Sequence, residues 1–294
     1  MYELKQVGAR TYYIESPAKI GVYLAEDGAY LIDSGSDKDA GRRARKILDE
    51  NGWKTLGILN THSNADHIGG NSYFQRQTGC KVFSTGIEKA FTEHPILEPS
   101  FLYGGYPCAE LRHKFLLAAE SEVSDFSDPD FPKELEIIPL PGHFFDMVGF
   151  KTPDGVIFLA DCLSSVQTLE KYKIGFIYDV AEYLKTLERV KTLNAKMFVP
   201  SHAPVCESAS ELAKLADLNA ETVRAVAEKI VELCAEPMCF ERILQRLFKE
   251  YGLKMSFEQY VLVGSTVRSY LSWLHDGGRL TAEFEDDMLL WRRA

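Results

Sequence analysis

One short stretch of this chain, residues 61–71, holds histidine, asparagine and aspartate side chains close together. His62 and His67 offer imidazole nitrogens, Asp66 offers a carboxylate and Asn64 an amide oxygen. The apolar run just before the stretch is typical of a buried strand, so these side chains should lie on the loop that follows it. Imidazole and carboxylate groups packed this closely are the ligands that a zinc-like ion requires. The stretch therefore predicts a metal site.

Four more polar residues elsewhere in the chain each follow a short apolar run. They are Asp33, His143, Asp161 and His202. Side chains at the ends of neighbouring buried strands gather at one edge of a sheet, where binding sites commonly form. Four histidines in such positions, together with the aspartates, are difficult to explain as ordinary core residues, which favours a metal centre.

The order and spacing of these residues resemble those of the metallo-β-lactamase superfamily, whose signature is His-x-His-x-Asp-His. The resemblance covers roughly residues 1–206 and rests on five motifs in the family's order. It implies an α/β fold, a four-layer αβ/βα sandwich, for this part of the chain. One position departs from the signature, because Asn64 stands where the family has its second histidine.

The resemblance also implies how two metal ions would share the ligands. One ion would take His62 and His143, with Asn64 as a weakened third ligand; the other would take Asp66, His67 and His202; Asp161 would bridge the two. Asp33 would support the ligand loop from behind, without touching the metal.

Hydrolysis is the chemistry expected of such a centre. A metal ion lowers the pKa of bound water from about 15.7 to about 7, which gives a metal-bound hydroxide at neutral pH. That hydroxide would attack an acyl or phosphoryl centre, with Asp66 and Asp161 as the catalytic carboxylates. The sequence thus predicts a metallo-hydrolase, with zinc as the expected metal.

Asn64 leaves three outcomes open. A neutral amide is a poorer ligand for zinc than imidazole, so the first site should bind more weakly or prefer manganese or iron. The chain could hold two ions with one weak member, work with a single ion, or have lost hydrolysis. We favour activity with at least one metal.

Bulk composition is that of an ordinary globular protein. The chain has 294 residues, 46% of them hydrophobic, and a formal net charge of −10, which weighs against general binding of polyanions. The N-terminus shows no secretory signal, and no apolar run is long enough to span a bilayer. The six scattered cysteines are expected to be free thiols, and we expect a cytoplasmic protein.

Residues 86–134 interrupt the alternation of strands and helices with an aromatic-rich segment. We interpret it as an insertion near the active site, with Tyr103 and Tyr106 as candidates for the substrate pocket. The alternative is a surface helix pair with a small core of its own.

Residues 207–294 change to a helical pattern that ends in a predicted hairpin, an order that resembles a winged helix. The hairpin carries Glu283, Glu285, Asp286 and Asp287, which phosphates would repel, so nucleic-acid binding is disfavoured. Dimerisation, as a homodimer, or a place beside the active site is the preferred interpretation.

Four functions follow from these observations. The first is hydrolysis of a small-molecule ester, thioester or lactone. The second is hydrolysis of nucleic acid, with the C-terminal segment as an anchor. The third is an iron-containing oxygenase or other redox member of the superfamily. The fourth is a metal-stabilised scaffold without catalysis.

Overall fold

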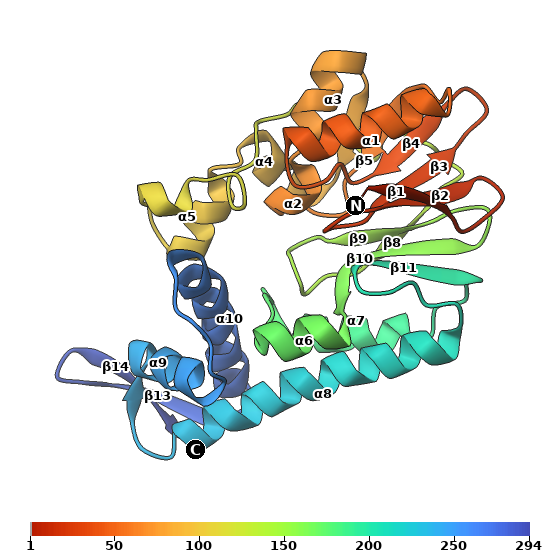
Figure 1. Ribbon diagram of the computed structural model, residues 1–294. Helices are drawn as coiled ribbons and strands as arrows, with labels where there is room; N and C mark the ends of the chain where they lie inside the picture. The colour runs from red at the N-terminus through yellow and green to blue at the C-terminus, as the bar shows by residue number, and fades with distance from the viewer. Residues whose placement is uncertain (1) are drawn as a thin grey trace.

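Two sheets packed face to face form the centre of the fold in the computed structural model, which describes residues 2–294 (Figure 1). The first sheet has its strands in the order β1 to β7, and the second has the order β11-β10-β9-β8. A third sheet, β12-β14-β13, lies in the C-terminal segment.

The first sheet begins antiparallel and continues parallel. Its strands are β1 (Glu3–Gln6), β2 (Thr11–Glu15), β3 (Ile20–Leu24), β4 (Ala29–Ile32), β5 (Thr55–Leu59), β6 (Lys81–Ser84) and β7 (Ser124–Asp125). The turn between β3 and β4 needs Gly28, because a Cβ there would lie 2.3 Å from the carbonyl oxygen of Lys54. Strands β4 to β7 run parallel, so the loops after them leave from one edge of the sheet.

The second sheet consists of β8 (Glu136–Pro139), β9 (Val148–Lys151), β10 (Val156–Ser164) and β11 (Met197–His202). β10 and β11 pair in parallel, with register shifts on both sides of Ala160. Ala160 has φ 49°, and this irregularity immediately precedes Asp161. A bulge of this kind redirects a side chain, and here it lies where the sequence analysis placed a metal ligand.

Hydrophobic side chains fill three layers between these sheets and the helices. Tyr23, Phe83, Phe150 and Phe158 belong to the core between the two sheets. α1 (Lys38–Glu50), α2 (Ala65–Ile68) and α3 (Asn71–Thr78) follow strands of the first sheet, and a second core lies under α1 and α3. α6 (Val166–Tyr172), α7 (Val180–Val190) and α8 (Ala209–Leu233) lie on the side of the second sheet (Figure 1). The predicted four-layer αβ/βα sandwich is therefore confirmed.

The insertion folds as α4 (Gly86–Glu93), α5 (Leu97–Tyr103), the 3₁₀ helix η1 (Ala109–Leu111) and β7. α5 lies at the side of the sandwich in Figure 1 and contacts α10 of the C-terminal segment. Leu102, Leu111 and Leu116 share a small core with Val261 of that helix. The insertion thus has a core of its own, and it is also joined to the C-terminal segment.

The C-terminal segment has the order of a winged helix. After α8 come β12 (Met238–Cys239), α9 (Phe240–Glu250), α10 (Phe257–Asp276), β13 (Leu280–Glu285) and β14 (Met288–Arg293). These elements match the predicted helices and hairpin. α10 contacts α5, α7, α8 and η1, and one hydrophobic core runs from the second sheet through α7 and α8 into α9 and α10.

No helix within residues 2–294 is long and apolar enough to cross a membrane. All six cysteines are free, as predicted.

Candidate metal centre

Four histidines and two aspartates converge where loops leave the two sheets. Two groups of ligand atoms form, each with its atoms within 4.8 Å of one another: Asp66, His67, Asp161 and His202 in one, and His62, His143 and Asp161 in the other. Asp161 belongs to both groups. This division matches the ligand sets that the sequence resemblance implied.

The carboxylate oxygens of Asp161 lie close to histidines of both groups. Its Oδ1 lies 3.1 Å from Nε2 of His67, and its Oδ2 lies 3.1 Å from Nε2 of His202 and 3.8 Å from Nε2 of His143. Asp66 Oδ2 lies 3.2 Å from the same nitrogen of His202. His67, His143 and His202 therefore turn their Nε2 atoms toward the shared carboxylate.

Hydrogen bonds behind the centre fix the tautomers of three histidines. Nδ1 of His67 lies 2.8 Å from Oδ2 of Asp33, which can only accept, so this Nδ1 carries the proton. Thr61 donates its hydroxyl proton to Asp33 at 2.7 Å, so its oxygen accepts from Nδ1 of His62 at 2.9 Å. Nδ1 of His202 donates to the carbonyl oxygen of Pro17 at 2.9 Å. Nε2 of each of these histidines is therefore the ring nitrogen available to a metal ion.

Several of these atoms have no hydrogen-bond partner. Within residues 2–294, Nε2 of His62, Nε2 of His67 and Oδ1 of Asp161 are buried and make no hydrogen bond, although the last two atoms lie 3.1 Å apart. Burying a polar atom without a partner is costly, and such atoms in a folded protein call for an explanation. Two imidazole lone pairs and a carboxylate oxygen fit a metal cation, and the residues present therefore suit a metal centre.

The carboxylates of the cluster strongly affect the pKa values of its histidines. Burial lowers the pKa of His202, but the carboxylates of Asp161 and Asp66 outweigh it and raise that pKa to about 10. The pKa of His67 is raised well above its usual value, because the same carboxylates and Asp33 overcome burial. Burial and the neighbouring His67 charge keep the pKa of His62 well below its usual value. Bound metal ions would replace the protons that the carboxylates attract.

Two buried glutamates of the insertion hold the loop that carries the ligands. Glu88 accepts from the backbone N–H and the hydroxyl of Ser63 at 2.9 and 2.6 Å, and from the N–H of Asp146 at 2.8 Å. Glu98 accepts from Nδ2 of Asn64 at 2.8 Å and from the N–H of Ala65 at 3.1 Å. Burial raises the pKa of Glu88 to about 7 and that of Glu98 well above its usual value.

Sequence reasoning missed both glutamates, although a signal was present. Glu88 shares a helix face with Phe91 and Thr92, and Glu98 shares one with Leu102, at the spacing of three or four residues that marks a buried face. A carboxylate on such a face needs buried donors, and here the metal-binding loop supplies them.

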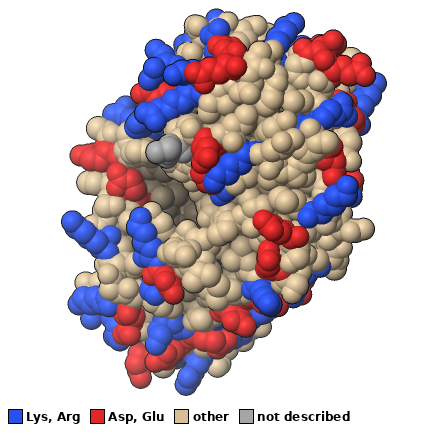
Figure 2. All heavy atoms as spheres, turned by 45° about the vertical axis from the view of Figure 1, so that its right-hand side comes forward, with Lys and Arg blue, Asp and Glu red and all other residues tan. Residues whose placement is uncertain are grey.

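A cleft of about 890 Å³ opens onto the centre. Asp66, Asp161, His143 and His202 lie in its floor, and Lys19, Lys171, Lys173, Phe115, Leu116 and Leu262 line its sides. On the face drawn in Figure 2, the surface is hollowed at mid-height, with charged side chains mainly around the rim. A smaller cavity of about 60 Å³ lies beside the centre and includes Phe176, Tyr183 and Tyr270.

The structure does not bring Tyr103 and Tyr106 into this cleft. Tyr103 is 48% exposed and lines a separate pocket of about 730 Å³ between α5, α7 and α10. Tyr106 is 73% exposed and pairs with Arg112 at the surface. α5 ends at Gly104 in a left-handed conformation, and both tyrosines lie outside the cleft. Phe115 and Leu116, later in the insertion, line the cleft instead.

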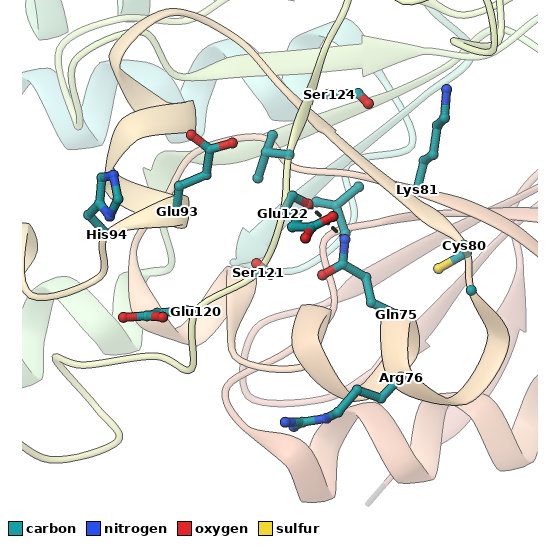
Figure 3. Close-up of a pocket in the computed structure, with 13 residues that line it drawn as sticks. Gln75, Arg76, Cys80, Lys81, Glu93, His94, Glu120, Ser121, Glu122 and Ser124 are labelled. Atoms are coloured by element: carbon teal, nitrogen blue, oxygen red, sulfur yellow. Dashed lines mark hydrogen bonds between the residues drawn. The ribbon is translucent and has the colours of Figure 1, made fainter.

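A larger depression of about 990 Å³ lies elsewhere, between α3, β6 and residues 120–124 (Figure 3). Gln75 crosses it to donate to the carbonyl oxygen of Glu122 at 2.7 Å. Its other side chains carry mixed charges, including Arg76, Glu93 and Glu120. None of the candidate metal ligands lines it, so size alone does not identify the functional cleft.

Comparisons with known proteins agree with this geometry. A family model described as the metallo-beta-lactamase superfamily matches residues 15–202. The Beta-lactamase-like protein 2 homolog of Drosophila melanogaster is 25% identical over 194 residues, 63% of this chain and 59% of that protein. The hydroxyacylglutathione hydrolase of Methylococcus capsulatus is 34% identical over 61 residues, 21% of this chain and 24% of that protein. The matched part of the chain thus spans less than two thirds of either relative.

Among solved structures, a beta-lactamase domain protein from Burkholderia ambifaria has the same fold. It superposes with a TM-score of 0.71 at 17% identity, over 99% of this chain and 94% of that one. The likeness therefore includes the C-terminal segment as well as the sandwich.

Proposed function

Because this chain belongs to the metallo-beta-lactamase superfamily, we propose that it is a metal-dependent hydrolase of a small-molecule ester, thioester or lactone. One observation carries the proposal. Within residues 2–294, buried ligand atoms of His62, His67 and Asp161 have no hydrogen-bond partner, and Asp161 lines a cleft that is large enough for a small molecule.

Metal ions held by the two ligand groups would acidify bound water and polarise the oxygen of the bond under attack. The residues of the chain have distinct parts in this reaction. Asp161 holds the two groups together, and its side chain is only 10% exposed. The Asp66 side chain is 38% exposed and lines the cleft, so its carboxylate can orient an attacking water. We propose zinc as the metal, with manganese or iron as alternatives.

The substrate proposed for this cleft carries a negative charge. Lys173 lines both the cleft and the small cavity beside the centre, and its ammonium has no ion pair or hydrogen bond within residues 2–294. It stands in a strained backbone conformation, φ 61° and ψ −47°, of the kind that persists at functional sites. A carboxylate on the substrate would pair with this ammonium. One relative is named as a hydrolase of an acylglutathione, which supports a thioester bond as the target.

Nucleic acid is a less favourable substrate for this chain. In a helix-turn-helix unit, the second helix enters the major groove of DNA. The corresponding helix in this chain is α10, which packs against α5, α7 and α8. The hairpin β13–β14 carries the acidic residues Glu283, Glu285, Asp286 and Asp287. The predicted homodimer stays a prediction.

The test is turnover by protein freed of metal and reloaded with zinc, manganese or iron in turn. Substrates would be matched carboxylate-bearing and neutral thioesters, aryl esters and lactones. We expect metal-dependent hydrolysis of at least one class, its loss in an Asp161→Asn variant, and a lower KM for the charged member of each pair. Metal-loaded protein that turns over none of these substrates would contradict the proposal, and oxygen uptake by the iron form would favour the redox alternative.

A further inference from the structure

Asn64 and Glu98 form a buried pair at the edge of the candidate metal centre. We propose that Glu98 is a positioning residue, which orients the Asn64 amide so that its Oδ1 completes the metal position of His62 and His143. This inference rests on the proposed metal-dependent function, but it concerns metal binding and can be tested without turnover.

The orientation of the amide follows from the contacts of Glu98. Nδ2 of Asn64 donates a hydrogen bond to Oε1 of Glu98 at 2.8 Å, a contact that only the nitrogen of the amide can make as a donor. The other oxygen of Glu98 accepts from the backbone N–H of Ala65, so the carboxylate is fixed at two points. With Nδ2 held in this way, Oδ1 must point away from Glu98.

Asn64 lies close to the candidate ligands both in the chain and in the cleft. Asn64 begins α2 and lines the cleft together with Asp66, His143 and Asp161. Within residues 2–294, its Oδ1 has no hydrogen-bond partner. An asparagine Oδ1 is separated from Cβ by the same number of bonds as a histidine Nδ1. The amide oxygen can therefore occupy the place of a ligating imidazole nitrogen.

The substitution changes the character of the first metal position. Both positions have two imidazoles and share Asp161, but the second adds the charged carboxylate of Asp66 where the first adds a neutral amide. The first position should therefore bind its ion more weakly. Compared with a three-histidine set, its oxygen donor shifts preference away from zinc and toward manganese or iron.

The experiment is stepwise binding of Zn²⁺ and Mn²⁺ to the full chain, measured by competition with a chelator of known affinity. We expect two steps, one tight and one weak. Asn64→Ala and Glu98→Ala should weaken the weak step by about 10-fold or more and leave the tight step unchanged. Asn64→His should tighten the weak step for zinc and raise its zinc-to-manganese preference, which a purely structural role of the residue would not do.

Glu93→Gln is the control. Glu93 belongs to the same insertion, at the end of α4, and pairs with Lys89 without bonding to the ligand loop. Its replacement should leave both binding steps unchanged. Circular dichroism of each variant would establish that it is folded, and Asn64→Ala tests the proposal even if Glu98→Ala fails to fold.

Two results would overturn the inference. One is an Asn64→Ala protein with both affinities at the wild-type level, whatever its effect on turnover. The other is a wild-type chain with a single binding step. Two binding steps that respond to Asn64 in a protein without hydrolytic activity would refute the proposed hydrolase and retain the Asn64–Glu98 pair.

Discussion

Oδ2 of Asp33 lies 2.8 Å from Nδ1 of His67 and accepts the hydroxyl proton of Thr61 at 2.7 Å. One buried carboxylate therefore fixes the ring of His67 directly and the ring of His62 through Thr61. Asp33 is itself a member of neither ligand group. Its backbone has φ 63°, a conformation that asparagine and aspartate adopt more readily than most residues.

An Asp33→Asn variant tests whether Asp33 holds the two histidine rings in place for the metal. Asparagine tolerates the same backbone conformation, so the fold should persist, but the variant loses the negative charge that holds Nδ1–H of His67. Loss of such an outer partner costs about 10- to 100-fold in metal affinity. Chelator competition should show a drop of this size, with the larger effect at the position that includes His67. An unchanged metal affinity would mean that the hydrogen bond between Asp33 and His67 does not affect how strongly His67 binds the metal.

Glu88 should make stability depend on pH. Its pKa is raised by burial to about 7 in the folded chain, from an ordinary value of 4.5. Between these values the folded state holds more protons than the unfolded state, so the free energy of unfolding should fall as pH rises from about 4.5 to about 7. Glu88→Gln cannot ionise and should flatten this part of the profile, as measured by urea unfolding.

The control for Glu88→Gln is Glu93→Gln, at the end of the same helix. It should retain the wild-type slope. If the Glu88→Gln profile were as steep as that of the wild type, another group would have to be responsible for the pH dependence.

Lys173→Gly should separate stability from substrate binding. Glycine adopts positive φ without strain, so the variant should be more stable by about 1 kcal/mol. The same change removes the free ammonium of the cleft and should raise KM for a carboxylate-bearing substrate while leaving that for its neutral analogue unchanged. Thermal unfolding and steady-state kinetics measure the two effects.

Lys171→Ala is the comparison for Lys173→Gly, because the Lys171 ammonium is already bonded to the Tyr172 hydroxyl. It should change KM little. Equal effects of Lys173→Gly on charged and neutral substrates would argue against a role in recognising the charge.

Removal of residues 207–294 should disrupt the sandwich as well. α8 and α10 bury Leu212, Ile230 and Val267 in the same core as Leu159 and Phe198 of the second sheet. A chain that ends at residue 206 would expose this apolar surface to water. We expect it to aggregate or to lose near-UV circular dichroism, whereas a compact, cooperatively unfolding fragment would show that the segment is dispensable for folding.

The side chains that converge at the candidate centre could be predicted, because each is marked by its local sequence. Each of His62, His143, Asp161 and His202 follows an apolar run, and the ends of parallel strands meet at one edge of a sheet. The C-terminal helices could also be predicted, from their capping residues and the helical spacing of their apolar residues. One such cap is Ser208, whose side chain accepts from the N–H of Glu211.

The parts that could not be predicted depend on packing between distant segments. Tyr103 and Tyr106 were chosen for their aromatic character, but the direction in which α5 leaves the site is set by its contacts with α10. Glu88 and Glu98 meet the ligand loop only because the insertion folds back over it, and no motif marks that contact. The unpaired ammonium of Lys173 also becomes apparent only in three dimensions.

The most direct test is the metal content of the full chain, measured by elemental mass spectrometry first as purified without added metal or chelator and then after reloading with metal. We predict close to two ions per chain after reloading, with one retained more firmly during purification. Two ions would agree with the two ligand groups that share Asp161. A folded chain that neither retains nor takes up metal would contradict the central claim that these histidines and aspartates form a metal centre.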